Sequence, residues 1–206
     1  MKKLVPYKTV RGALAALDNG GRFYNLFSRS GDGVISMGEL SKATGHWLSF
    51  KQSSLFFTMM LDRLAEADRA TVVARLDASL RRRVRQNQPK NVEPEALAEF
   101  SQEKGALVVE GTPRYCRSQS QFTSFIMIPV QAGSVTTQMM IPIYEEYSLY
   151  DLTSSSKQTV PIAVPKKLPR LPERSMKFGG FMHQASSSKK TPDSSECYFG
   201  PVCYLP

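Results

Sequence analysis

The chain is poor in the residues from which disulfide scaffolds and common metal centres are built. Its 206 residues include three cysteines and two histidines, His46 and His183, which lie far apart in the sequence. A disulfide framework and a Cys/His zinc site of ordinary spacing are therefore excluded. No apolar run reaches the roughly 18 residues of a transmembrane helix. The basic start, Met1-Lys2-Lys3, has no apolar segment behind it, so we expect no signal peptide and a cytoplasmic protein.

The common catalytic signatures are also missing. The sequence contains no Gly-x-Ser-x-Gly elbow, no P-loop and no glycine-rich dinucleotide fingerprint. Cys116 has no histidine partner that the sequence can place beside it. We therefore expect a protein that is not an enzyme. Lys and Arg outnumber Asp and Glu by 27 to 18, which gives a formal net charge of +9.

The spacing of apolar residues divides the chain into a helical part and a strand-rich part. Residues 1–104 are typical of helices, because apolar residues recur there every three or four positions. The expected helices cover 9–18, 22–27, 39–44, 53–65 and 69–85, with a last short one from about Glu93. The segment 53–65 is apolar on all sides, so we expect it to be buried. Asp68 is the expected N-cap of the helix 69–85.

From Ala106 the pattern changes to one that is typical of strands. The runs 106–109, 122–130 and 135–144 are rich in β-branched, aromatic and Met residues. Residues 131–134 have the length of a hairpin connection, and two strands paired across it would explain why Ile128-Pro129-Val130 resembles Ile141-Pro142-Ile143. We predict an α+β domain in which residues 105–153 form an antiparallel sheet packed against the helical region 1–104.

Residues 154–206 differ in kind from the rest of the chain. They are rich in Ser, Pro and Lys, with scattered apolar residues. Such a composition buries too little surface to offset the entropy of ordering, so we expect a disordered basic tail.

One segment has the composition of a cation-binding loop. In the twelve residues Ser28 to Glu39, oxygen-bearing side chains occupy positions 1, 3, 5, 9 and 12, and glycine occupies position 6. Calcium prefers six to eight hard oxygen ligands, and a short loop can supply them only by turning sharply in its middle. Gly33 suits that turn because glycine tolerates a positive φ.

With the preceding Tyr24-Asn25-Leu26-Phe27, this segment resembles a calmodulin-type EF-hand over residues 10–45. The resemblance implies that Ile35 pairs with a neighbouring loop. It also implies a set of calcium ligands: side-chain oxygens of Ser28, Ser30, Asp32 and Ser36 (the last through water), the backbone carbonyl of Val34, and both oxygens of Glu39.

The loop departs from the family in two respects. Ser28 and Ser30 replace the usual acidic residues and Arg29 adds a positive charge, so we expect weak calcium affinity, about 10⁻⁴ M or poorer. The usual partner loop is missing as well. A loop begun at Asp62 would be a degenerate hand without metal. The alternative is a helix–loop–helix that keeps its glycine turn and serine caps only to join two helices.

Two further motifs suggest binding partners. The first is a cluster of arginines that could attract a nucleic acid or an anionic surface, or that could simply complement the C-terminal end of a helix dipole: Arg81, Arg82, Arg83 and Arg85. The second has the spacing of a polyproline ligand, although a proline-rich spacer is the simpler interpretation: Lys166, Pro169, Pro172 and Arg174.

The sequence therefore favours a non-enzymatic interaction or regulatory protein that binds a protein partner and, weakly, calcium. The alternative hypothesis is a structural or assembly protein that binds nucleic acid or an anionic surface through its basic helix and tail. The sequence leaves the oligomeric state open.

Overall fold

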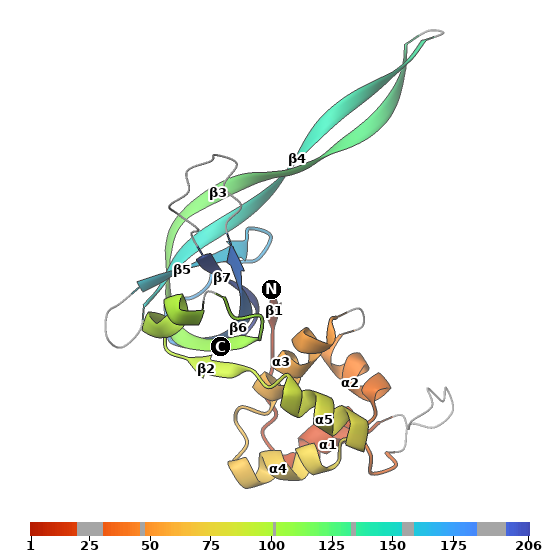
Figure 1. Cartoon of the computed structure of the whole chain (residues 1–206), viewed down its shortest axis with the longest axis vertical. Coiled ribbons are helices and arrows are strands. Elements are labelled where there is room, and N and C mark those ends of the chain that lie inside the picture. Colours follow the sequence, from red (N-terminus) through yellow and green to blue (C-terminus); the bar gives the residue numbers. More distant parts are fainter. Residues whose placement is uncertain (20–30, 46–47, 101, 133–134, 154–158, 185–196) are drawn as a thin grey trace.

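The computed structural model describes residues 1–19, 31–45, 48–100, 102–132, 135–153, 159–184 and 197–206. A cluster of helices lies at one end of the molecule, a sheet lies next to it, and a long hairpin extends from the sheet away from the helices (Figure 1). The predicted α+β class is confirmed. No helix in the described part is long and apolar enough to cross a membrane.

The described part of the helical half contains five α-helices, and hydrogen-bonding side chains cap most of their N-termini. The caps are Thr9, Ser36, Ser49 and Asp77, and those at Ser36 and Ser49 form reciprocal capping boxes. The helices are α1 (Val10–Leu17), α2 (Met37–Thr44), α3 (Phe50–Met60), α4 (Glu66–Ala74) and α5 (Ala78–Gln86). The predicted helix 22–27 lies outside the described residues.

The prediction of one continuous helix over 69–85 was wrong. The chain forms α4 and α5 with a break at Arg75–Asp77, and Asp77, not Asp68, caps the second helix through a bond from the Ser79 N–H. The apolar stripe continues through both helices, which is why periodicity alone suggested one. The break exists because the backbone at Leu76 pairs with a distant segment, Ile35.

The described strands form one seven-stranded sheet. The strands are β1 (Lys2–Lys3), β2 (Lys90–Val92), β3 (Leu107–Ala132), β4 (Val135–Thr153), β5 (Thr159–Pro165), β6 (Met176–Gln184) and β7 (Cys197–Leu205). A 3₁₀ helix, η1 (Pro94–Phe100), follows β2 where a short helix was predicted. The predicted hairpin is confirmed, since β3 and β4 pair antiparallel up to Ala132 and Val135.

Three of these strands lie in the segment that was expected to be a disordered tail. The described residues 159–184 and 197–206 include β5, β6 and β7, so the expectation was wrong for them. Their pairings with β3 and β4 complete a closed ring, β3–β4–β5–β7–β6–β3. Apolar residues that are scattered in the sequence gather inside it, among them Ile162, Phe178 and Phe199, all fully buried.

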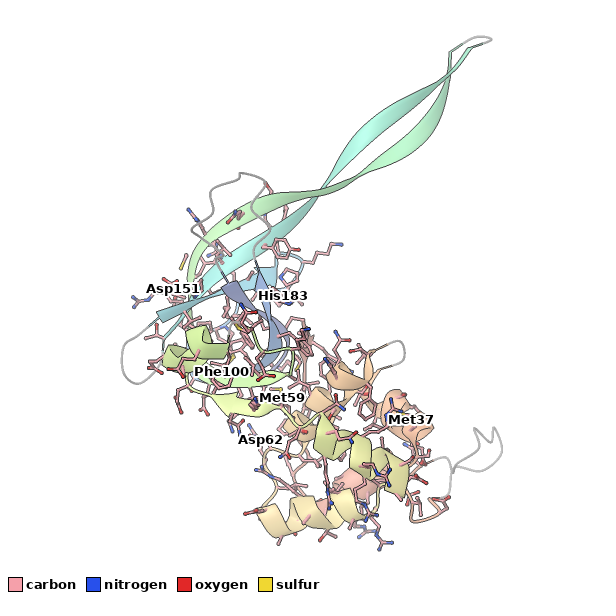
Figure 2. All side chains as sticks on the ribbon, viewed as in Figure 1. Met37, Met59, Asp62, Phe100, Asp151 and His183 are labelled. Atoms are coloured by element: carbon pink, nitrogen blue, oxygen red, sulfur yellow. The ribbon has the colours of Figure 1, made fainter. Side chains whose placement is uncertain are left out.

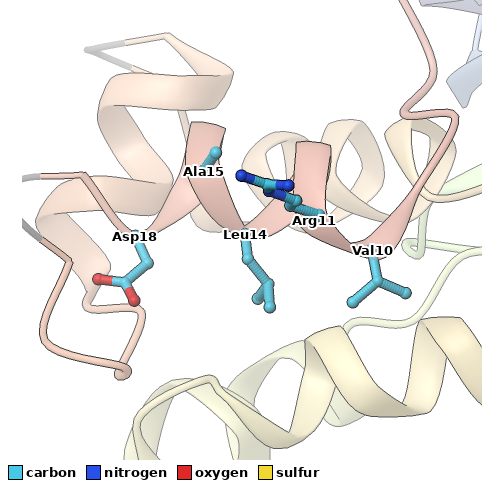
Figure 3. A pocket seen from close by; sticks show the side chains of 5 residues that line it. All are labelled: Val10, Arg11, Leu14, Ala15 and Asp18. Carbon is cyan, nitrogen blue, oxygen red and sulfur yellow. The ribbon is translucent and has the colours of Figure 1, made fainter.

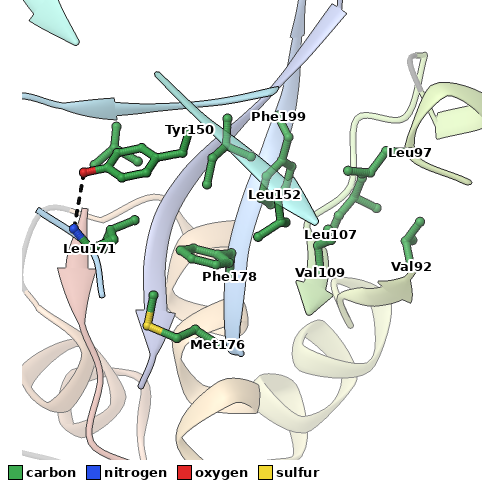
Figure 4. Packing of buried hydrophobic residues seen from close by; sticks show 12 residues of the cluster. Val92, Leu97, Leu107, Val109, Tyr150, Leu152, Leu171, Met176, Phe178 and Phe199 are labelled. Carbon is green, nitrogen blue, oxygen red and sulfur yellow. Dashed lines mark hydrogen bonds between the residues drawn. The ribbon is translucent and has the colours of Figure 1, made fainter. Parts of the chain in front are cut away.

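The strands of the ring contribute to two apolar cores. Leu107, Val109 and Tyr150 lie in the inner core, which Figure 4 shows in close view. Val108 and Cys203 belong to a second cluster, which packs against helix α3. Successive side chains of a strand point to opposite faces, so the adjacent residues Val108 and Val109 serve different cores.

Helix α3 joins the two halves of the molecule. Leu55, Phe56 and Met59 pack on the sheet, whereas Phe57 packs among the other helices. The prediction that this segment is buried is therefore confirmed. Just past α3, the Asp62 carboxylate lies 2.9 Å from Lys177 Nζ of β6; Figure 2 shows Asp62 and Met59 at this junction.

The close approach of α3 to the sheet depends on a glycine. A Cβ atom at Gly179 of β6 would clash with Met59 Sδ and lie 2.9 Å from both Cys203 Sγ and Leu55 Cδ1. The same packing raises the pKa of the Cys203 thiol to about 12, because burial disfavours the thiolate.

We expect Gly179→Ala to destabilise the protein by about 1–3 kcal/mol, the usual cost of overfilling a packed core. Urea unfolding followed by circular dichroism measures the change. Gly38→Ala is the matched control: Gly38 lies in α2 with only Ser36 Oγ nearby, at 4.0 Å, so the added methyl should stabilise by about 0.5–1 kcal/mol. An unchanged midpoint for Gly179→Ala would contradict the close packing of α3 on β6.

Candidate functional site

The loop that resembles a cation-binding loop turns where the sequence predicted. Gly33 has a φ of 81°, the left-handed conformation that favours glycine. Asp32 Oδ1 accepts a hydrogen bond from the Val34 N–H at 2.9 Å, which tightens the turn. Of the predicted ligands, Ser28 and Ser30 lie outside the described residues, so the structure describes the second half of the loop.

An aspartate from outside the loop holds this turn in place. The Asp18 carboxylate, at the C-terminal end of α1, accepts hydrogen bonds from the Asp32 and Gly33 N–H groups, each at 2.9 Å. Sequence reasoning did not identify Asp18 as part of the site. The one available signal was its position as the last polar residue of the first helix, and many helices end in this way.

Glu39, the expected bidentate ligand, forms a helix cap. Its Oε2 accepts hydrogen bonds from the Ser36 N–H at 2.8 Å and the Ser36 hydroxyl at 2.9 Å, and its Oε1 accepts one from the Asn19 N–H at 3.1 Å. The side chain is buried. Glu39 thus ties the end of α1 to the start of α2, and both of its oxygens already have donors.

The pairing expected for Ile35 is present, although the partner is not the one proposed. The Ile35 N–H donates to the Arg75 carbonyl at 2.7 Å, and the Asp77 N–H donates to the Ile35 carbonyl at 3.0 Å. The partner segment is the break between α4 and α5, not the degenerate loop begun at Asp62. The loop that precedes α2 and the break between α4 and α5 therefore meet through a short backbone ladder. Ile35 and Leu76 are both fully buried.

The described carboxylates do not form a calcium ligand set in this arrangement. No group of three or more His, Cys, Asp or Glu side chains in the described part of the chain could hold an ion. Arg75 Nη1 lies 3.4 Å from the position of a Cβ atom on Gly33, so a cation near the turn would also meet a guanidinium. Calcium binding would require Glu39 to exchange its present donors for the ion.

A shallow, mainly apolar hollow runs along α1 and ends at this loop. Its lining, shown in Figure 3, comes from one helix and the residue after it: Val10, Arg11, Leu14, Ala15 and Asp18. Asp18 therefore belongs both to the hollow and to the turn at Gly33. A movement of the loop would move this side chain and so change the lining of the hollow.

The four arginines of α5 divide into two with structural contacts and two without. Arg81 Nη2 donates to the Ala74 and Leu76 carbonyls at 2.7 and 3.0 Å, so it clamps the α4–α5 break. The Arg83 guanidinium lies 4.3 Å from the Phe50 ring centroid, a cation–π contact. Arg82 and Arg85 are exposed, and in the described part of the chain neither forms an ion pair.

The predicted polyproline segment is a loop anchored to the sheet. Lys166 Nζ lies 2.9 Å from the Glu146 carboxylate, and the Leu171 N–H donates to Tyr150 Oη at 3.2 Å (Figure 4). Arg170 stacks 4.4 Å above the Tyr115 ring. Pro169, Pro172 and Arg174 are exposed, but Leu171 between the prolines is buried. Docking of this segment in an aromatic groove would require these contacts to open.

The cysteines with described side chains lack the features of a nucleophile. The thiol of Cys203 is buried and its pKa is about 12. Cys116 is exposed at an irregularity of β3, where partial burial and a hydrogen bond with Asp151 raise its pKa. An activated thiol needs the opposite shift. Comparison with known proteins found no family model and no curated protein that matches the chain.

We expect Glu39→Ala to destabilise the helical half by about 1–2 kcal/mol, because it leaves three donors without their acceptor. Glu39→Gln should cost less, since the amide oxygen can still complete the capping box. Thermal unfolding at 222 nm measures both. Glu66→Ala, in the first turn of α4 where the side chain is exposed, is the control and should change little. Equal effects at Glu39 and Glu66 would contradict the capping role.

Proposed function

We propose that this protein is a non-enzymatic interaction protein whose helical half is a pair of helix–loop–helix units resembling an EF-hand pair. The observation that supports the proposal best is the backbone pairing of Ile35 with the Arg75–Asp77 segment. A helix–loop–helix that served only to join two helices would not need this second unit. The pairing makes the loop and α4–α5 move as one body.

In this geometry the loop binds calcium weakly at most. The loop supplies Asp32 and Glu39 as carboxylates, and Glu39 must first leave Asn19 and Ser36. Arg75 adds a repulsive charge close to the turn. Binding would therefore change the contact between α1 and α2, which is the structural change that a partner could detect.

We expect calcium to bind with a midpoint of about 10⁻⁴–10⁻³ M. Calorimetry and the fluorescence of Trp47, the sole tryptophan, measure this binding. Glu39→Gln should abolish this response. Arg75→Gln should lower the midpoint about threefold to tenfold by removing a nearby like charge. Arg82→Gln, which removes the same charge from the exposed face of α5, should leave it unchanged.

No heat and no fluorescence change at millimolar calcium would remove calcium from the proposal. A response that survives Glu39→Gln would show that the ion binds elsewhere. Neither result would argue against the pairing of the two helical units, because that pairing can be tested without any ion.

A second candidate function rests on Arg82 and Arg85. These side chains project from α5 without an ion pair in the described part of the chain, and the whole chain has a net charge of +9. Exposed, unpaired guanidinium groups favour a phosphate-bearing partner such as a nucleic acid.

For this alternative, a single-stranded oligonucleotide should bind with an affinity that falls steeply with salt. The double variant Arg82→Gln/Arg85→Gln should reduce the slope of log K against log salt by about one to two. Lys3→Gln/Lys8→Gln removes the same charge from the exposed N-terminal segment and serves as the control. Equal losses from both double variants would indicate nonspecific attraction and would rule out a site on α5.

A further inference from the structure

The distal part of the β3–β4 hairpin stands apart from the rest of the molecule. The pairing of β6 with β3 involves residues 107–111, and that of β5 with β4 involves residues 147–153. Beyond them, β3 and β4 pair with each other alone among the described strands, out to Ala132 and Val135. Figure 1 shows this part extending away from the helices and from the other strands. We call residues 118–132 and 135–144 the arm.

The composition of the arm is unusual for a hairpin without a third strand. Residues 118–144 contain no Asp, Glu, Lys, Arg or His, in a chain of which 22% is charged. The register pairs Ile126 with Ile141 and Ile128 with Met139, so apolar residues occupy paired positions of the two strands. A two-stranded ladder is marginally stable in water unless something packs on it. The arm therefore needs a cover that the described helices and strands do not provide.

The two prolines of the arm indicate that its cover lies on a face and not along an edge. Pro129 is opposite Gln138, and Pro142 is opposite Phe125. Proline has no N–H group, so each must occupy a position where the N–H would otherwise point outward. Each strand thus lacks one donor on its free edge, which discourages open-ended pairing with further strands. The faces of the arm have no such block.

The charge distribution identifies the cover as the arm of a second copy. Two chains that each carry +9 repel one another wherever their charged surfaces meet. The uncharged arm is the stretch through which they can approach without repulsion. If the two arms cross about a two-fold axis, the uncharged arms pack together and the charged remainder of each copy lies at an opposite end of the dimer. Glu145 and Glu146, which directly follow the arm, make an anionic lipid surface a poorer cover.

The size of the arm is sufficient for a reversible dimer. Ten paired residues extend about 33 Å, and two strands present a face about 10 Å wide. A face of this size covers about 330 Å², so packing two hairpins face to face buries roughly 660 Å² in total, below the standard range and in keeping with a weak, reversible contact. We infer that the arm is a self-association element, through which two copies of the chain dimerise by packing one face of each hairpin against the other. This inference is independent of the function proposed for the helical half.

The test is the mass of the full chain in solution, measured by sedimentation equilibrium at physiological salt. We expect the mass to rise from the monomer's 23.0 kDa toward twice that value as the concentration increases, with a midpoint in the micromolar range. Ile128→Lys should keep the chain monomeric at the same concentrations, because it places like charges in the interface. Val5→Lys is the matched control: Val5 is a large apolar residue exposed on the body, so the dimer should persist.

Two further variants separate loss of the interface from loss of the fold. An equimolar mixture of Ile128→Lys and Ile128→Glu should dimerise although neither variant does alone, because the opposite charges then face each other. Replacing residues 122–144 by Asn-Gly joins the cross-strand partners Gln121 and Glu145 through a two-residue turn. This shortened chain should be monomeric, with the circular dichroism of a folded body.

Four results would overturn the inference. The wild-type chain could remain monomeric throughout, or the shortened chain could dimerise as well as the full chain does. Mass that grows without limit would indicate edge pairing of strands. A monomer that sediments with vesicles of neutral phosphatidylcholine through an intact arm would assign the apolar surface to lipid instead.

Discussion

Two backbone hydrogen bonds between Ile35 and the Arg75–Asp77 segment organise the helical half. They join a loop that follows α1 to the break between α4 and α5, and both paired residues, Ile35 and Leu76, are fully buried. The same bonds explain why the helix is interrupted although the apolar stripe runs on from Val72 to Val84: the backbone at Leu76 cannot be helical and also pair with Ile35. Arg81 then satisfies the carbonyls that the break leaves over.

Helix α3 connects the helical half to the sheet, because it packs on both. Its buried residues face two ways, because one side belongs to the helical core and the other packs on the outer face of the strands. Gly179 allows the close approach, and the ion pair between Asp62 and Lys177 fixes the end of the contact. Since α3 belongs to both cores, a shift of the helix–loop–helix pair would also displace α3 and alter its packing on the sheet from which the arm extends.

Local signals in the sequence predicted most of the helical half. The glycine turn at Gly33 and the period of the apolar residues are properties of short segments, so they can be read without knowledge of the fold. The features that were missed depend on contacts between distant residues. The break at Leu76 needs Ile35, and the strands β5, β6 and β7 need one another, since their Pro- and Gly-containing segments become a core only when Ile162, Phe178 and Phe199 meet. Within the site, the glycine turn was predictable, whereas the bond between Glu39 and the Asn19 N–H joins residues that are twenty positions apart.

Amide hydrogen exchange of the Ile35 and Asp77 N–H groups tests the central claim most directly. Both donate in the ladder between the two helix–loop–helix units, so the account predicts protection comparable to that of amides within α2 and α5. Exchange at the rate of an exposed loop, with α2 and α5 still protected, would mean that the units fold side by side without pairing. That result would contradict the account of the helical half as one body.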